Sequence, residues 1–216
     1  VTGSIRLNGR ELLGCREREF NQIRGKEIAY IPQGSGNGLN PLYTVGRQLC
    51  EAIRKHQPCT RREALVQAAA LLESFGLEHG AALCRSYPFQ LSGGMRQRVM
   101  IAAAMICRPS LLIADEPTTA LDAATQESIL KLLKKLNDKY GMSILFISHN
   151  LRVVKELCTR VFVMKDGEIL EEGETEVVFQ NPKTEYTKAL IAAIPARVGE
   201  NPYYEMLKQK AGRQYD

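Results

Sequence analysis

Short apolar runs alternate with longer amphipathic stretches along much of the chain. The runs at 28–31, 111–114 and 143–147 are four or five residues long and almost wholly apolar, as in strands buried on both faces of a sheet. A stretch of helical periodicity at 123–140 separates the second run from the third and ends at Gly141. This order of elements predicts an α/β fold with a mostly parallel sheet and helices on both of its faces.

The chain between the first two predicted strands has a different pattern. From residue 45 to residue 107 apolar residues recur at helical spacing, most clearly between Leu65 and Phe75, just before Gly76. The pattern therefore predicts a helical subdomain inserted into the α/β core.

Turn signals occur near the N-terminus and again after the third predicted strand. The pairs 8–9 (Asn-Gly) and 166–167 (Asp-Gly) each separate two strand-like segments, and so predict β-hairpins. After residue 174 we expect a short helix and then a helix over about 185–194. The predicted parts are an α/β core (1–40 and 108–174), a helical subdomain (41–107) and a C-terminal extension (175–216).

The charge, the longest apolar run and the cysteine spacing each argue against certain classes of protein. The 216 residues carry a net charge of +5, but 24 acidic residues are spread among the basic ones. That is not the clustered basic footprint of a nucleic-acid-binding protein. The longest apolar run, 99–107, is about half of the roughly 20 residues that span a membrane. Six cysteines without C-x-x-C spacing favour free thiols in a reducing cytosol.

Two carboxylates follow the predicted strand at 111–114. Asp115 and Glu116 precede Pro117, which ends the strand, so both carboxylates lie at the carboxyl edge of the sheet, where α/β proteins bind ligands. Asp115 suits Mg²⁺, a hard cation that takes one or two carboxylates and shares the rest of its shell with phosphates and water. Glu116 could orient or polarise an attacking water. A solvated strand end is the alternative interpretation.

The helix that begins at residues 92–94 can bind an anion. Ser92 is a natural N-cap, and Gly93 and Gly94 leave the N–H groups of the first turn unobstructed. Each glycine costs about 1 kcal/mol of helix stability relative to alanine, which a cap alone would not require. An ordinary capped helix start is the alternative.

These two elements, in this order, resemble a known family. The segments LSGGMRQR (91–98) and LLIADEPTTALD (111–122) are similar to the signature motif, Walker B segment and D-loop of ATP-binding cassette (ABC) ATPases. Gln33, after the first strand, resembles the Q-loop glutamine, and His149, after the third, resembles the switch histidine. Three further segments resemble the ATPase subunits of peptide and nickel importers: 39–49, 87–105 and 177–195.

The resemblance implies a P-loop NTPase-like ABC ATPase core with ATP and Mg²⁺ as cofactors. Asp115 would hold Mg²⁺ through water, Glu116 would act on the attacking water, and His149 would contact the γ-phosphate. Gln33 would sense Mg²⁺ and the attacking water, and would link the site to a membrane partner.

The resemblance also implies a dimer in which two subunits enclose each ATP. Ser92, Gly93 and Gly94 would bind the γ-phosphate of ATP held by the opposite subunit, and Asp122 would communicate across the interface. The implied partners are two transmembrane permeases, a second ATPase subunit and, indirectly, an extracytoplasmic solute-binding protein, with no nucleic acid. The implied location is the cytoplasmic face of the cell membrane.

The phosphate-binding P-loop is missing from these residues. The pattern G-x-x-x-x-G-K-[ST] does not occur: the Gly25-Lys26 pair is followed by Glu27 and has Phe20 where the first glycine should stand. We therefore expect a fold that is N-terminally incomplete, and a chain that by itself binds ATP weakly and hydrolyses it negligibly. Two alternatives stay open: a half-site subunit that does not hydrolyse ATP, and a soluble ABC ATPase of DNA repair or translation.

Overall fold

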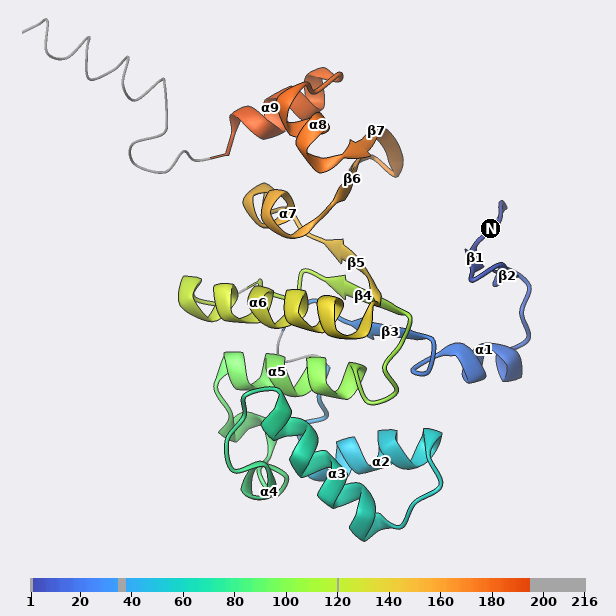
Figure 1. Ribbon diagram of the computed structural model, residues 1–216, viewed down its shortest axis with the longest axis vertical. Coiled ribbons are helices and arrows are strands. Elements are labelled where there is room, and N and C mark those ends of the chain that lie inside the picture. The colour runs from blue at the N-terminus through green and yellow to red at the C-terminus, as the bar shows by residue number, and fades with distance from the viewer. Residues whose placement is uncertain (1, 35–37, 120, 195–216) are drawn as a thin grey trace, which may run out of the picture. The chain divides into compact units, whose positions relative to one another are not determined.

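The computed structural model describes residues 2–34, 38–119 and 121–194 (Figure 1). The chain forms two compact units, Val1–His149 and Asn150–Asp216, each with a buried apolar cluster of its own. The three-part division predicted from the sequence stays a prediction.

The first unit contains a parallel sheet in the order β3-β4-β5. These strands are β3 (Ile28–Ile31), β4 (Leu111–Asp115) and β5 (Ser143–Ile147). The register places Asp115 opposite Ile147, so the carboxyl ends of β4 and β5 lie side by side. The predicted α/β fold with a parallel sheet is confirmed.

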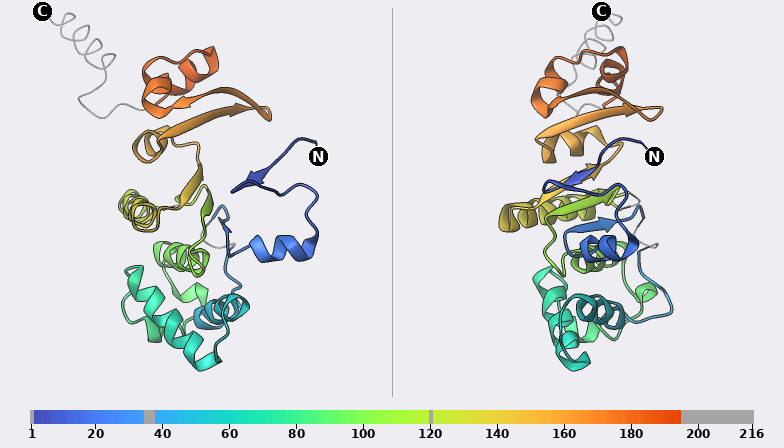
Figure 2. Two further views of the ribbon diagram at one scale, coloured as in Figure 1. Left: turned by 45° about the vertical axis from the view of Figure 1, so that its right-hand side comes forward. Right: turned by 90° about the vertical axis from the view of Figure 1, so that its right-hand side faces the viewer.

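Helices α5 (Gly93–Ala104) and α6 (Ala123–Tyr140) cover one face of the sheet (Figure 2). Their buried side chains join those of the strands, because Leu112 and Ile129, both inaccessible to solvent, belong to one apolar cluster. The other face is more open. It exposes roughly half of each of three side chains: Tyr30 on β3, and Leu145 and Ile147 on β5.

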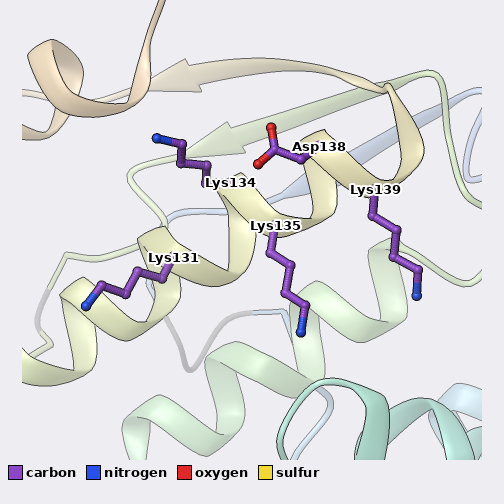
Figure 3. Close-up of a pocket in the computed structure, with 5 residues that line it drawn as sticks. All are labelled: Lys131, Lys134, Lys135, Asp138 and Lys139. Atoms are coloured by element: carbon purple, nitrogen blue, oxygen red, sulfur yellow. The ribbon is translucent and has the colours of Figure 1, made fainter.

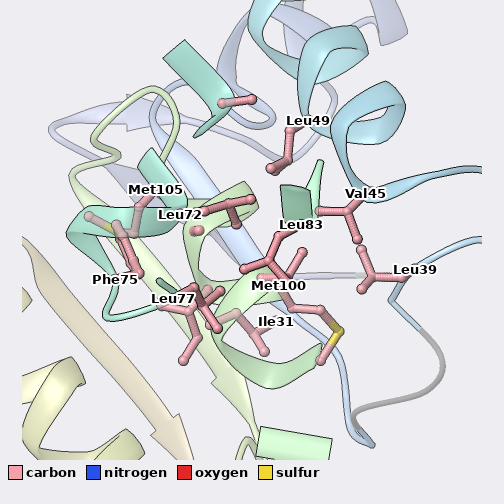
Figure 4. Close-up of a cluster of buried hydrophobic side chains, with 14 of the residues drawn as sticks. Ile31, Leu39, Val45, Leu49, Leu72, Phe75, Leu77, Leu83, Met100 and Met105 are labelled. Atoms are coloured by element: carbon pink, nitrogen blue, oxygen red, sulfur yellow. The ribbon is translucent and has the colours of Figure 1, made fainter. Parts of the chain in front are cut away.

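The predicted helical region forms a group of helices. It comprises α2 (Val45–His56), α3 (Arg61–Ser74), α4 (Gly80–Leu83) and the 3₁₀ helix η1 (Pro88–Gln90). Thr44 and Thr60 cap α2 and α3 by accepting backbone N–H bonds at the third helical residue. The core of these helices continues into β3 and α5 through Ile31 and Met100 (Figure 4).

The N-terminal hairpin is confirmed, whereas the helix after it was not predicted. Strands β1 (Arg6–Leu7) and β2 (Arg10–Glu11) are joined by Asn8 and Gly9 with φ values of 48° and 82°, as a type I′ turn requires. Helix α1 (Glu17–Ile23) has only seven residues, too few to show clear periodicity.

The second unit packs helices against a hairpin. Its elements are α7 (Leu151–Leu157), β6 (Arg160–Lys165), β7 (Glu168–Glu174), α8 (Thr175–Gln180) and α9 (Glu185–Ala192). The predicted Asp166-Gly167 turn is confirmed, with positive φ at both residues. No helix in the described ranges is both long and apolar enough to cross a membrane.

In this unit, hydrogen bonds to Glu171 on β7 link that strand to the start of α9. The Glu171 side chain is buried and accepts hydrogen bonds from the N–H groups of Lys183 and Thr184, at 2.8 and 3.2 Å, and from the Thr184 hydroxyl. Burial acts to raise the pKa of the Glu171 carboxyl, but hydrogen bonds from Lys183, Thr187 and Thr184 together hold that pKa below its ordinary value.

We predict that Glu171→Ala destabilises the second unit by about 1–3 kcal/mol, because it leaves buried donors without a partner. The folded-state pKa is lowered, so the stabilisation is present above the unfolded pKa of about 4.3 and is lost as the pH falls through the folded pKa. Hydrogen exchange of the α9 amides, measured against pH, checks both effects.

The matched control is Glu172→Gln, which changes an exposed carboxylate on the same strand. It should leave exchange in α9 unchanged. Equal acceleration of exchange by the two substitutions would contradict the role given to Glu171.

Candidate active site

Glu116 directly follows β4 and adopts an unusual backbone conformation. Its N–H donates to the carbonyl of Ile147 at 2.9 Å, which extends the pairing with β5 by one residue. Its φ is 44°, in the left-handed region, which costs a residue other than glycine about 1–2 kcal/mol. Such strain persists where surrounding contacts compensate for it, and it is common at functional sites.

The Glu116 carboxylate binds three side chains, two of which, Gln33 and His149, come from distant parts of the chain. Its Oε2 accepts hydrogen bonds from Nε2 of Gln33 at 2.7 Å and Oγ1 of Thr119 at 2.9 Å, and its Oε1 lies 2.9 Å from Nδ1 of His149. The fold thus brings together three of the predicted site residues: Gln33, Glu116 and His149. The remaining partner, Thr119, was not predicted.

These contacts determine the charge and tautomers at the site. Hydrogen bonds, from His149 first and then from Thr119 and Gln33, lower the pKa of Glu116 despite an opposing effect of burial. An ionised carboxylate only accepts hydrogen bonds, so Nδ1 of His149 carries a proton. The His149 side chain is 74% exposed, and its Nε2 is therefore open to a ligand.

Asp115 lies next to this network with a partner of its own. Its Oδ2 accepts a 2.9 Å hydrogen bond from the hydroxyl of Tyr30 on β3. The sequence analysis missed Tyr30, because a contact between two strands depends on their register. Thr119 did have a local signal, since it stands three residues after Glu116, and its N–H closes a turn onto the Glu116 carbonyl at 3.1 Å.

The oxygen atoms at the carboxyl edge of the sheet suit a metal ion that takes only a few of its ligands from the protein. Asp115 offers a carboxylate, and Gln33 offers an amide oxygen, because its amide nitrogen is used by Glu116. Nowhere in the described ranges do three His, Cys, Asp or Glu side chains gather to hold a metal by themselves. Mg²⁺, which completes its shell with phosphates and water, fits such a donor set.

The other predicted site residues lie where α5 and α6 begin. Ser92 caps α5 by accepting the N–H of Met95 at 3.2 Å. Asp122 caps α6 by accepting the N–H of Thr125 at 2.9 Å and its hydroxyl at 2.6 Å. The two helix starts touch, because a Cβ added to Gly94 would lie 2.6 Å from Cγ2 of Thr125.

This second group is distinct from the first. In the described part of the chain, Ser92, Gly93, Gly94 and Asp122 donate or accept no hydrogen bond in the network around Glu116. The structure thus presents a carboxylate network at the edge of the sheet and, separately, the N-terminal ends of two helices.

Comparison with known proteins identifies the family of the chain. The family described as ABC transporter matches residues 1–119, more than half of the chain. The chain belongs to the ABC transporter family. Its structure resembles a dimeric ABC transporter cassette, MJ0796, solved in a post-hydrolysis state bound to ADP and Pi. That match has 30% sequence identity and a TM-score of 0.71, and covers 81% of this chain and 74% of the cassette.

Curated relatives in this family are importer subunits by name. The chain is 45% identical over 194 residues to the glutathione import ATP-binding protein GsiA of Escherichia coli (strain K12), and 46% identical over 203 residues to BMEII0863 of Brucella melitensis biotype 1, named for peptide import. These matches cover 88% and 92% of this chain, but only 31% and 60% of the relatives.

We predict that Gly94→Ala destabilises the fold, because the new methyl group overlaps Thr125 and the start of α5 must move. The overlap costs about 1–3 kcal/mol, against a gain of up to about 1 kcal/mol in helix propensity. Thr125→Ser removes the overlapping methyl and keeps the hydroxyl that binds Asp122. In that background Gly94→Ala should therefore cost much less. Urea unfolding of the four proteins in this cycle measures the difference.

The single substitution Thr125→Ser is the control for a general loss of packing. A loss caused by Gly94→Ala that is the same in both backgrounds would contradict the proposed contact between α5 and α6.

Proposed function

We propose that this chain belongs to the ATP-hydrolysing subunit of an importer, in which ATP hydrolysis drives uptake of peptides or nickel. The observation that carries this proposal is the Glu116 carboxylate, held by Gln33, Thr119 and His149 at the carboxyl edge of a parallel sheet. The names of the relatives, which refer to glutathione and peptide import, favour peptides as the solute.

In this proposal the network around Glu116 orients the attacking water. Phosphoryl transfer depends mainly on positioning and on stabilising charge, so a carboxylate fixed by three partners suits the task. The contacts of Glu116 lower its pKa, so the carboxylate is ionised at neutral pH and can accept a hydrogen bond from water. His149 would present Nε2 to the γ-phosphate, and Gln33 would report the state of the site to a membrane partner.

Asp115 and Gln33 would hold Mg²⁺, which neutralises charge on the phosphates when bound. Both supply oxygen atoms, the ligands that this hard cation prefers. Because the protein contributes few donors, the ion would depend on nucleotide and water for most of its shell.

The start of α5 would serve the opposite subunit of a dimer. Its N–H groups and helix dipole favour a phosphate, and Ser92, Gly93 and Gly94 keep the approach open. The contact of Gly94 with Thr125 connects this site to α6, whose cap Asp122 would lie at the dimer interface. The dimeric cassette that this chain resembles supports the arrangement.

An exposed apolar surface next to the helical region supports docking to a permease. Leu42 and Phe89 are 79% and 70% exposed, and Phe89 stacks on Tyr87 with ring centres 5.5 Å apart. A 2.9 Å hydrogen bond from the N–H of Val45 to the carbonyl of Ser86 joins the two segments that carry them. Contiguous exposed apolar surfaces mark interaction sites, and we propose that these side chains belong to one.

The remaining parts of the proposal follow from the importer assignment. The partners would be two transmembrane permeases and a second ATPase subunit, with an extracytoplasmic solute-binding protein acting through the permeases. The chain would work at the cytoplasmic face of the cell membrane.

A soluble ABC ATPase of DNA repair or translation is a second competing proposal, beside the half-site or regulatory subunit. Four lysines lie around Asp138 on the exposed side of α6 (Figure 3): Lys131, Lys134, Lys135 and Lys139. Acidic residues interrupt this surface, and Lys131 pairs with Glu127 at 2.6 Å. A mixed helix face is weaker support for nucleic-acid binding than a continuous basic stripe. Salt-sensitive binding to DNA or RNA would favour the competitor.

We predict that residues 1–216 alone bind ATP weakly and hydrolyse it negligibly, because they lack a P-loop. A fluorescent ATP analogue with Mg²⁺ measures binding to this chain and to a form extended upstream by any encoded P-loop. Tight binding by the extended form alone is the expected result. Micromolar binding by residues 1–216 would contradict the prediction, and failure of both forms would favour the half-site subunit.

In the form that hydrolyses ATP, we predict that Glu116→Gln lowers the turnover rate by about 100-fold or more and leaves nucleotide binding intact. The substitution keeps the side-chain shape and removes the charge that acts on water. The control is Glu127→Gln, which changes an exposed carboxylate on α6 and should keep the rate. Wild-type turnover by Glu116→Gln would refute the proposed role.

A further inference from the structure

Tyr30 reaches Asp115 across two neighbouring strands. The register of β3 and β4 pairs Tyr30 with Ile113, so Asp115 is its diagonal neighbour on the same face of the sheet. Diagonal neighbours lie within reach of aromatic side chains. The Tyr30 hydroxyl donates to Oδ2 of Asp115 at 2.9 Å.

We propose that Tyr30 is a positioning residue for the metal-binding carboxylate, an inference that rests on the proposed function. By holding Oδ2, the hydroxyl fixes the orientation of the Asp115 carboxylate and leaves Oδ1 available to Mg²⁺ or to its bound water. Tyr30 itself would not touch the metal.

Packing does not explain why the Tyr30 hydroxyl binds Asp115. Tyr30 is 54% exposed on the open face of the sheet, where its hydroxyl could bind water equally well. It instead bonds to Asp115, while the neighbouring Glu116 is held by a different hydroxyl, that of Thr119. The two adjacent carboxylates are therefore held by different hydroxyl groups, and that of Tyr30 acts on Asp115.

Tyr30→Phe tests the inference, because it removes the hydroxyl and keeps the ring. The ¹⁵N-labelled form extended upstream by the P-loop is titrated with Mg²⁺ in the presence of a non-hydrolysable ATP analogue, and the amide resonances of residues 115 and 116 are followed by NMR. Weak binding is measurable in this way without any hydrolysis. The half-saturating Mg²⁺ concentration should rise roughly threefold to tenfold, less than for a fully buried hydrogen bond to a charged group. An unchanged or lower value overturns the inference.

Two control variants separate this inference from the proposed function. Tyr87→Phe removes the hydroxyl of another exposed tyrosine, one that stacks on Phe89, and should leave the Mg²⁺ response unchanged. Asp115→Asn should abolish the response. If Asp115→Asn keeps it, or if the wild-type extended form has none, the metal site itself is wrong. If Asp115→Asn abolishes it and Tyr30→Phe has no effect, only the role of Tyr30 is refuted.

Tyr30→Met, which also lacks a hydroxyl, should weaken the Mg²⁺ response as Tyr30→Phe does. The dispersion of the apo spectra reports whether each variant is folded. Loss of the fold in both variants would overturn the inference as well, because Tyr30 would then be needed for folding and not for orienting Asp115.

Discussion

The carboxylate of Glu116 is the point at which distant parts of the first unit meet. Its hydrogen bonds join the segments that follow β3, β4 and β5, through Gln33, Thr119 and His149. These hydrogen bonds require that the three strands run parallel and that their carboxyl ends lie together. They also form with Glu116 in a left-handed backbone conformation. The sheet, its register and this strained residue therefore serve one arrangement of side chains.

The helices of the first unit are held to one another by similarly specific contacts. Arg98 on α5 donates to the Phe75 carbonyl, at the end of α3, at 2.7 Å and to the Ser128 hydroxyl on α6 at 2.5 Å. Gly94 permits the starts of α5 and α6 to touch at Thr125. Helix α5 is therefore in direct contact with both the helical region and α6.

The segment at 177–195 is the one that most resembles peptide importers. As far as residue 194, the structure shows what its residues do. Thr184 caps α9 and, with the N–H of Lys183, binds Glu171 on β7, while Thr187 is buried beside them. Val178 packs in the apolar cluster of the hairpin. This part of the resemblance therefore reflects how α8 and α9 pack on the hairpin, and it carries no direct information about the solute.

The sequence by itself determined the local elements and the chemistry of the site. The helix at 123–140 and the strand at 143–147 have the predicted bounds, because periodicity, caps and turn residues act over a few neighbouring positions. Gln33, Glu116 and His149 were recognised from their order and their resemblance to a family. Tertiary structure alone decided that Tyr30 reaches Asp115 and that Gly94 meets Thr125. Those contacts depend on strand register and helix approach, which no local pattern encodes.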